Sequence, residues 1–316
     1  MEEDFKFYEA VITNKIPIIS ISHNIITCKD ESLPASLSKT WHDILRNKLN
    51  YSGLILADDI SMVDNEKYSF NKSVAVLAVK AGNDIILTSN YYNHYDDVKK
   101  AVKSGDINED IINKACRRII AWKLKYLINN KSEKIEKEGI KEKENKESKE
   151  NEKKAKKEIF EEYYKKAEEY MKNIKIEEKI SQMFFPKYNV INANNDIKNI
   201  KPGGFVFFGK DFNHEEEYIQ KCIKQIQNIS NKNFGLPLGL AVDEEGGIEN
   251  RVSTYHRIAG EFPSSKSSQS ILNEILKIDK EKRELLKKFY LNINLAPIAD
   301  IFKDLNNYIY IYYKGI

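Results

Sequence analysis

The hydrophobic positions of residues 1–130 fall into short runs separated by longer amphipathic stretches. The short runs are rich in isoleucine and leucine and lie at residues 16–22, 53–56 and 84–87. The longer stretches have helical spacing and lie at residues 37–48, 74–81 and 106–127. Strands that are apolar on both faces, with helices between them, are typical of a parallel sheet covered by helices. This part of the chain is therefore predicted to be α/β.

The pattern changes abruptly at residues 131–157, which are dominated by lysine and glutamate and contain almost no apolar residue. Such a run can be a solvated linker or a single exposed helix held by charge pairs four residues apart. A segment that binds a partner is the alternative. We interpret residues 131–157 as a linker between two parts of the chain.

The α/β pattern resumes in residues 158–316. Helices are predicted at residues 163–171, 176–183, 215–229 and 267–289. Strands are predicted at residues 183–188, 204–208, 238–242 and 292–299. The tyrosine-rich residues 302–316 have strand propensity but no obvious partner strand.

Composition excludes several classes of protein. The 51 basic and 48 acidic residues nearly cancel, so the chain has no general attraction for nucleic acid or a membrane surface. Cys28, Cys116 and Cys222 lie far apart, which favours free thiols over disulfides or a metal site. No apolar run approaches the roughly 20 residues of a membrane span, and the acidic residues 1–4 do not resemble a signal peptide. We expect a cytoplasmic protein without a metal or cofactor.

Four predicted strands end at a polar residue, namely His23, Asp58, Asp243 and Asp300. The carboxyl ends of the strands form the active-site face of an α/β barrel, so these residues are candidates for catalysis or ligand binding. The alternative is that an aspartate at a strand end only caps the next helix.

The segment around Asp58 resembles the nucleophile signature of family 3 glycoside hydrolases. Residues 44–62 contain a basic helix end, a glycine, three apolar residues, and then Asp58 at the position of the family's nucleophile. Ala57 stands where the family usually has serine or threonine. Residues 22–24 and 34–38 are similar to the sixth strand of the family's barrel and the loop after it. Residues 81–87 resemble the eighth strand.

The second part of the chain resembles the beginning of the same family. Residues 175–184 are similar to the opening helix and first strand, and residues 203–208 to the second strand. Asp243, with Arg251 beyond it, resembles the third-strand motif that holds the sugar hydroxyls, although Ile248 stands where arginine is usual. Residues 294–300 resemble the fourth strand.

The resemblance, to the β-N-acetylhexosaminidase type, implies a (β/α)8 TIM-type barrel in circularly permuted order. Strands six to eight would lie in residues 1–130, the linker in residues 131–157, and strands one to four in residues 158–316. Permutation is physically allowed because the ends of a closed barrel lie close together. Strand five has no counterpart, and the resulting open edges make another copy of the chain a possible partner.

The resemblance also implies retaining hydrolysis of terminal β-linked N-acetylhexosamine in cell-wall or chitin-type sugars. Asp58 would be the nucleophile, and Asp243, Arg251, His23 and Asp300 would bind the carbohydrate substrate. A retaining glycosidase also needs an acid/base. The family's Lys-His pair and its Gly-His-Gly loop with the acid/base have no match here. Impaired activity is therefore expected.

Two other interpretations stay open at this point. The chain can be a non-catalytic relic that still binds sugar through Asp243 and Arg251. It can also be the product of a truncated tandem gene, with the end of one copy followed by the start of the next. A continuation in the flanking DNA that encodes the missing segments would distinguish an evolved permutation from such an accident.

Overall fold

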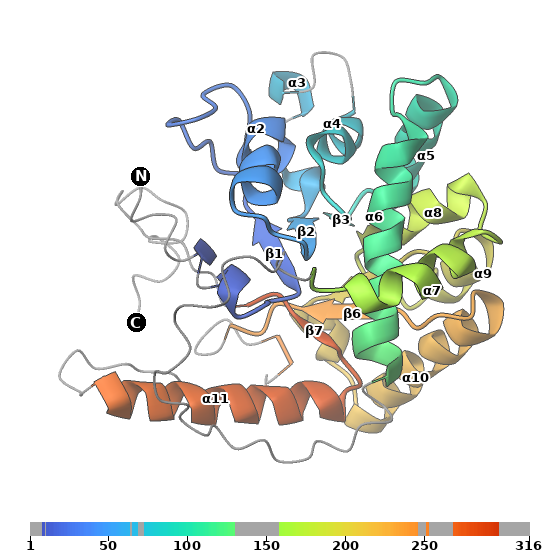
Figure 1. The fold of residues 1–316 in the computed structure, drawn as a ribbon. Helices are drawn as coiled ribbons and strands as arrows, with labels where there is room; N and C mark the ends of the chain where they lie inside the picture. Colours follow the sequence, from blue (N-terminus) through green and yellow to red (C-terminus); the bar gives the residue numbers. More distant parts are fainter. Residues whose placement is uncertain are drawn as a thin grey trace.

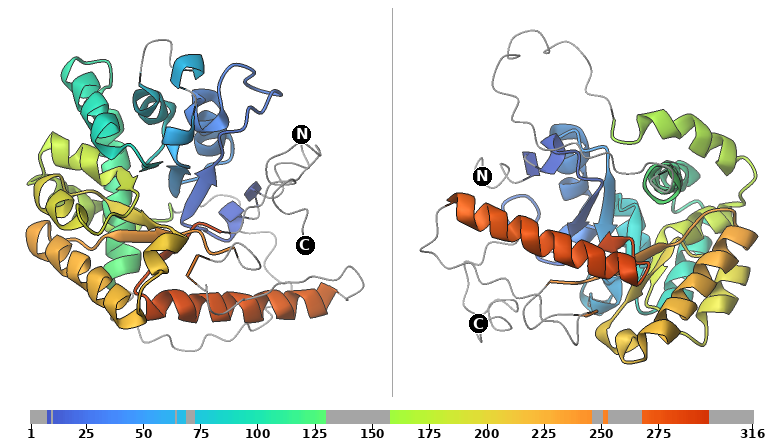
Figure 2. Two further views of the ribbon diagram at one scale, coloured as in Figure 1. Left: turned by 180° about the vertical axis from the view of Figure 1, so that it is seen from behind. Right: turned by 90° about the horizontal axis from the view of Figure 1, so that it is seen from below.

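The computed structural model describes residues 8–9, 11–63, 65–68, 73–129, 158–245, 251–252 and 268–296. Within these ranges the protein is an α/β structure, with parallel strands in the interior and helices around them (Figures 1 and 2). The predicted α/β class is confirmed. The predicted linker and the tyrosine-rich residues 302–316 lie outside the described residues.

Seven strands occur in the described part of the chain: β1 (Ile18–Ile21), β2 (Leu54–Ala57), β3 (Ile85–Thr88), β4 (Phe184–Pro186), β5 (Gly204–Phe207), β6 (Gly239–Val242) and β7 (Ile293–Asn294). They form two parallel sheets in the orders β1-β2-β3-β4 and β5-β6-β7. A parallel bridge between Lys187 and Val206 connects β4 with β5. The outer strands β1 and β7 are not paired with each other within the described residues, so these strands do not form a closed barrel.

The pairing of β3 with β4 joins the two parts of the chain that flank the predicted linker. Ile86 is in register with Phe184, and Leu87 with Phe185. These strands come from opposite sides of residues 130–157, yet they are direct neighbours in one sheet. The two flanking parts therefore share a sheet and do not fold as separate units.

The α-helices in the described part of the chain are α2 (Lys39–Asp43), α3 (Asn65–Tyr68), α4 (Val74–Ala81), α5 (Tyr91–Lys103), α6 (Glu109–Trp122), α7 (Glu161–Met171), α8 (Ile176–Gln182), α9 (Ala193–Asn199), α10 (Glu216–Asn233) and α11 (Ser268–Lys288). Three 3-10 helices and two π-helices accompany them: η1 (Ala35–Leu37), η3 (Ile60–Met62), η6 (Gly209–Phe212), η2 (Ile44–Lys48) and η4 (Lys123–Ile128). The helix α11 lies at the opposite end of the array from α4 and α5 (Figure 1).

The predicted elements are present in the described ranges, with shifts of a few residues at their ends. Of the strand predicted at residues 292–299, residues 292–296 are described, and Ile293–Asn294 form β7. The helix predicted at residues 37–48 is divided into η1, α2 and the π-helix η2. Ser38 occupies the N-cap position of α2, but its hydroxyl donates to Asp30 rather than capping the helix. Three helices, the short α3 and the longer α5 and α9, were not among the predicted elements. The sequences of α5 and α9 are rich in polar residues, and tertiary packing buries only one side of each.

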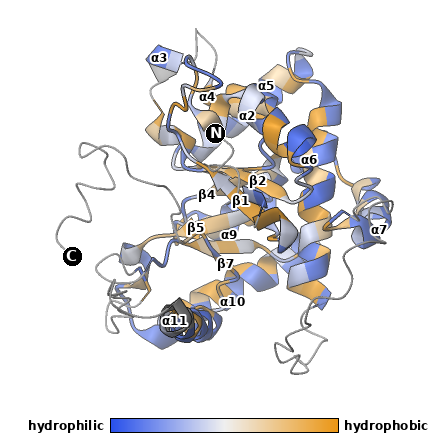
Figure 3. Ribbon diagram, turned by 60° about the vertical axis from the view of Figure 1, so that its left-hand side comes forward, coloured by the Kyte–Doolittle hydropathy of each residue, from blue (hydrophilic) through white to orange (hydrophobic). Residues whose placement is uncertain are grey.

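The interior contains two groups of buried apolar side chains. The larger group includes Leu54, Ile119 and Phe184 and so spans both parts of the chain. On β5, Phe205 and Phe207 belong to the smaller group, whereas Val206 between them belongs to the larger one. This alternation shows that β5 is covered on both faces, as expected for parallel strands. Figure 3 shows hydrophobic strands in the interior and hydrophilic outer helix surfaces.

A buried cluster of charged residues fixes the amino ends of β2 and β3. The Asp84 side chain is fully buried and forms ion pairs with Arg46 and Arg118. Its Oδ2 also accepts a hydrogen bond of 2.9 Å from the backbone N–H of Ile55 in β2. A buried carboxylate is tolerated when it is paired and hydrogen-bonded. The cluster therefore holds the amino end of β2 in position, and β2 is the strand that leads to Asp58.

Candidate active site

Asp58 lies at the carboxyl end of β2, where the chain leaves the core. All four residues of β2 are buried, whereas Asp58 is exposed. Its Oδ1 accepts a hydrogen bond of 2.8 Å from the backbone N–H of Asp59. Within the described part of the chain, no other group bonds this carboxylate. A carboxylate with a free oxygen at such a strand end can bind or attack a ligand.

Asp59, the next residue, is held by its neighbours. Its Oδ1 accepts hydrogen bonds of 3.0 Å from the backbone N–H groups of Ser61 and Ser89, and its Oδ2 accepts from the Ser89 hydroxyl. The bond from Ser61 makes Asp59 the N-cap of η3. Because Ser89 follows β3, Asp59 also ties the ends of β2 and β3 together. Helix capping, the alternative role for an acid at this strand end, therefore belongs to Asp59 and leaves Asp58 free.

His23 lies beyond the end of β1 and contacts the loop after β2. Its Nε2 is 3.1 Å from the carbonyl oxygen of Asp59, and its Nδ1 is 2.7 Å from the hydroxyl oxygen of Ser36. A carbonyl oxygen only accepts hydrogen bonds, so Nε2 carries the proton. In the neutral imidazole, Nδ1 then accepts from Ser36. This arrangement fixes the loop that carries Asp58, and direct sugar binding by His23 stays a prediction.

A chain of hydroxyl groups behind Asp59 leads to the buried His94. The Nδ1 atom of His94 is 2.8 Å from the Thr88 hydroxyl, which lies 3.1 Å from the Ser61 hydroxyl. The Ser61 hydroxyl oxygen in turn accepts hydrogen bonds from the backbone N–H groups of Ser89 and Asn90. Burial lowers the pKa of His94 and so favours its neutral form. The sequence offered no signal for His94, because it lies on α5, outside any strand-end motif.

Asp243 and Arg251 lie close together beyond the end of β6. The guanidinium Nη2 of Arg251 is 3.8 Å from Oδ2 of Asp243, and their side chains are 34% and 38% exposed. The backbone and side chain of Arg251 pass over Gly209, where an added Cβ would lie 3.8 Å from the nearest Arg251 atom. The pair therefore presents hydrogen-bond donors and acceptors to solvent next to the loop after β5.

Glu244 positions this pair and was not singled out by the sequence motifs. It is fully buried, and its Oε2 accepts hydrogen bonds from the backbone N–H groups of Arg251 (2.9 Å) and Val252 (2.7 Å). Its own N–H donates to Oδ1 of Asn294 in β7 over 3.1 Å. Glu244 therefore connects β6, β7 and the segment that carries Arg251. Its place directly after Asp243 was the only sequence signal.

Parallel pairing places the candidate residues on one side of the strands. His23, Asp58 and Asp243 follow the carboxyl ends of β1, β2 and β6, and each pairing from β1 to β7 is parallel. Carboxyl ends of parallel strands lie at the same edge. Asp300, the fourth predicted strand-end residue, lies outside the described residues.

Cys28, Cys116 and Cys222 are free thiols in the structure. The described ranges contain no group of three or more His, Cys, Asp or Glu side chains that could hold a metal ion. Among the helices of the same ranges, none has the length and apolar character needed to cross a membrane.

The protein has parallel strands inside a layer of helices, and acidic residues follow the carboxyl ends of these strands. It therefore belongs to the class of α/β proteins whose active sites lie at the carboxyl ends of the strands. The chain belongs to glycosyl hydrolase family 3: the sequence model described as "Glycosyl hydrolase family 3 N terminal domain" matches residues 1–122 and 175–310. The first matched range contains His23 and Asp58, and the second contains Asp243, Arg251 and Asp300. The family resemblance found in the sequence is thereby confirmed.

Several curated proteins are similar to parts of the chain. The β-hexosaminidase of Haemophilus influenzae is 35% identical over 85 residues, which cover 27% of this chain and 24% of the relative. The β-hexosaminidase of Actinobacillus succinogenes is 32% identical over 111 residues, covering 34% and 31%. An uncharacterized secreted glycosyl hydrolase of Arthroderma benhamiae is 30% identical over 120 residues, covering 36% and 34%. The chain thus spans about a third or less of the length of each of these relatives.

Solved structures from the same family are also similar. The β-N-acetylhexosaminidase of Beutenbergia cavernae matches with 26% identity and a TM-score of 0.32, covering 37% of this chain and 36% of that one. The family 3 β-N-acetylglucosaminidase of a Paenibacillus species matches with 17% identity and a TM-score of 0.35, covering 75% and 45%.

Proposed function

We propose that this chain is a retaining glycosidase for terminal β-linked N-acetylhexosamine in cell-wall or chitin-type sugars, with Asp58 as the nucleophile. The observation that carries the proposal is the contrast between two neighbouring acids. Asp59 is bound on both carboxylate oxygens, whereas Asp58 is exposed with one oxygen free. A carboxylate nucleophile needs a fixed position and one oxygen that no other protein group binds. The names of the similar β-hexosaminidases support the substrate class.

Sugar binding is assigned to the pair formed by Asp243 and Arg251. Carboxylate oxygens accept from sugar hydroxyls, and the guanidinium donates to them, so the half-exposed pair offers both functions. The buried Glu244 holds the backbone of Arg251 in place by accepting a hydrogen bond from its N–H group. His23 and Asp300 are proposed as further sugar-binding positions on the evidence of the family motifs.

In the proposed reaction, a carboxylate oxygen of Asp58 forms a bond to the anomeric carbon while the bond to the leaving oxygen breaks. The leaving oxygen must take up a proton, and a water molecule must later lose one to release the sugar from Asp58. The family's acid/base motif has no match in the sequence. General acid–base help is typically worth about 10²- to 10⁴-fold in rate, so impaired turnover is part of the proposal.

The test uses an aryl β-N-acetylglucosaminide whose phenol is strongly acidic and leaves without protonation. The first step should then proceed, while the second step still lacks its base. We expect a burst of about one phenol per protein followed by very slow turnover. Mass spectrometry of the quenched protein should find one sugar on the peptide that contains Asp58.

Asp58→Asn should abolish both the burst and the attached sugar. Asp96→Asn is the matched control and should leave both unchanged; Asp96 is an exposed acid on α5, and within the described residues its ion pair is with Lys99. A folded protein that shows no burst but still binds N-acetylglucosamine would instead identify a sugar-binding relic. Rapid hydrolysis of a natural disaccharide would contradict the proposed impairment.

The proposed architecture is a permuted (β/α)8 barrel without strand five. It is supported by the strand order, in which β3, similar to the family's eighth strand, pairs with β4, similar to its first. The chain ends that flank residues 130–157 are also adjacent: Asn129 donates to the Tyr163 hydroxyl, and Lys125 donates to the carbonyl of Ile159, both over 2.9 Å. Pairing of β1 or β7 with a second copy is the proposed way to cover the outer strands.

A further inference from the structure

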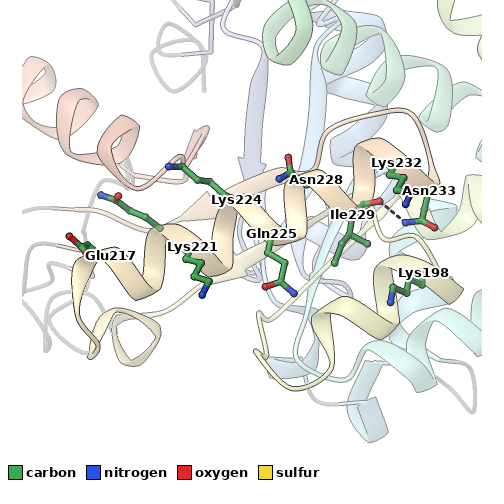
Figure 4. Close-up of a pocket in the computed structure, with 10 residues that line it drawn as sticks. Lys198, Glu217, Lys221, Lys224, Gln225, Asn228, Ile229, Lys232 and Asn233 are labelled. Atoms are coloured by element: carbon green, nitrogen blue, oxygen red, sulfur yellow. Dashed lines mark hydrogen bonds between the residues drawn. The ribbon is translucent and has the colours of Figure 1, made fainter.

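A groove lies on the outer surface between α9 and α10 (Figure 4). Its volume is about 810 Å³. The residues that line it are almost all polar: Lys198, Glu217, Gln220, Lys221, Lys224, Gln225, Asn228, Ile229, Lys232 and Asn233. The site proposed for catalysis uses none of them.

The groove concentrates positive charge. Lys221, Lys224 and Lys232 lie on α10, and Lys198 lies on the neighbouring helix α9 (Figure 4). The three lysines of α10 fall within an arc of about 80° around the helix and extend over about 16 Å of its length. All four are exposed. Glu217 is the only acidic residue among the described residues of the lining.

These charges are not neutralised within the described part of the chain. None of the four ammonium groups lies within 4.0 Å of a carboxylate there, and Lys224 instead lies over the ring of Tyr290 at 4.6 Å. Just outside the groove, Lys288 pairs with Glu216 over 2.6 Å. Like charges three or four residues apart destabilise a helix, so an anion bound across the lysines would relieve this repulsion.

The remaining lining residues indicate the chemistry of the anion. The side-chain amides of Gln225 and Asn228 form no hydrogen bond with other described residues, and each can both donate and accept. Amides next to lysines suit a ligand that carries hydroxyl groups as well as negative charges. Ile229 is the single apolar residue of the lining, which argues against an apolar partner.

We propose that this groove binds an anionic polysaccharide, a sugar chain with repeated carboxylate or phosphate groups. The lysines contact the charges, and Gln225 and Asn228 contact the hydroxyls. The site is separate from Asp58 and is tested by binding alone, so its failure and the failure of the proposed glycosidase are distinguishable.

The experiment measures binding of the full chain to polygalacturonate by calorimetry at several salt concentrations. Fully methyl-esterified polygalacturonate is the neutral polymer of matched structure. We expect binding to the charged polymer only, with an affinity that falls as salt rises. The variant K221Q/K224Q/K232Q should lose at least about tenfold in affinity, since each exposed contact contributes modestly.

The matched control is K165Q/K166Q/K172Q, which removes the same number of exposed lysines on and directly after α7. Its affinity should stay within about twofold of the parent, because these lysines lie outside the groove. Thermal unfolding verifies that both variants fold. Equal losses of affinity in the two variants would mean that net charge, not the groove, determines binding, and would overturn the proposal. No binding to polygalacturonate, or equal binding to the charged and the neutral polymer, would also overturn it. Tighter binding to a DNA duplex, lost only in the groove variant, would replace the polysaccharide with nucleic acid.

Discussion

At the scale of single residues, surroundings rather than residue type separate the roles of the charged groups. Asp58 and Asp59 are adjacent acids at one strand end, yet only Asp59 is tied down by Ser61 and Ser89. Asp84 is also an aspartate next to a strand, but at the amino end of β3, where Arg46 and Arg118 surround it. The same carboxyl group therefore serves as a candidate nucleophile, a cap or a buried anchor.

Lys123 is a second residue whose behaviour is set by its surroundings. It is 1% exposed, and its Nζ donates to Oε1 of Gln182 over 2.8 Å. Burial lowers the pKa of its ammonium group to about 7. Between this pKa and the usual value of about 10.4, the unfolded chain binds a proton that the folded chain does not. The free energy of unfolding should therefore rise with pH across this window.

Lys123→Met removes this dependence. At pH 7 the lowered pKa of Lys123 destabilises the folded protein by about 4 kcal/mol, and the loss of the bond to Gln182 offsets about 1 to 3 kcal/mol of the gain from its removal. We expect the variant to be more stable than the parent by about 1 to 3 kcal/mol at pH 7. The difference should shrink or reverse as the pH approaches 9.5. Urea unfolding of parent and variant at several pH values measures this difference in the free energy of unfolding.

The exposed Lys165→Met serves as the control and should differ from the parent equally at each pH. A difference between Lys123→Met and the parent that does not vary with pH would show that Lys123 is charged in the folded protein.

At the scale of elements, the packing of β4 against β5 and β6 depends on two glycines. A Cβ at Gly204 would lie 2.1 Å from the carbonyl oxygen of Gly239 and 2.6 Å from the ring of Phe185. A Cβ at Gly239 would lie 2.5 Å from the same ring. The side chain of Phe185, which is fully buried, therefore occupies the space that the two glycines leave open.

Gly204→Ala should destabilise the protein by about 2 to 3 kcal/mol, because the added methyl group overpacks this contact. The free energy of unfolding in urea measures the change. Gly209→Ala is the control: its Cβ would meet no atom closer than 3.8 Å, so we expect a change below about 1 kcal/mol. Equal effects of the two substitutions would mean that the contact with Phe185 and Gly239 does not determine the cost.

At the scale of the whole molecule, the two parts of the chain form one core although residues 130–157 separate them in sequence. Phe160 is fully buried and lies edge-on to Tyr126, with ring centroids 6.4 Å apart. The contacts of Asn129 with Tyr163 and of Lys125 with Ile159 hold the two flanking ends together. A short connection is therefore sufficient to span them.

Deletion of residues 134–153 should leave the fold intact. Closure entropy varies slowly with loop length, so the free energy of unfolding should stay within about 1 kcal/mol of the parent or rise slightly. Chemical unfolding measures this, and sedimentation of parent and variant shows whether two copies associate. A loss of several kcal/mol would mean that the deleted residues pack on the fold. A parent that stays monomeric at high concentration would contradict pairing through β1 or β7.

The sequence predicted most of the strands because buried parallel strands are apolar on both faces and short. It also predicted Asp58, Asp243 and Arg251 as the candidate site, since polar residues at strand ends and the family motifs are local features. It did not indicate the helices α3, α5 and α9 or the supporting roles of His94 and Glu244. His94 and Glu244 contact residues of other elements, Thr88 and Asn294 among them. Contacts between elements leave no pattern in the local sequence.

By itself, the sequence determined the α/β class, the family and the residues at the strand ends, because each depends on the order of residues within short segments. Only the tertiary structure decided the register in which β3 pairs with β4, with Ile86 opposite Phe184, and that Asp59, not Asp58, is the bound acid. It also decided that four lysines of α9 and α10 share one groove. Strand pairing, burial and charge concentration are long-range properties, and they exist only when distant segments meet.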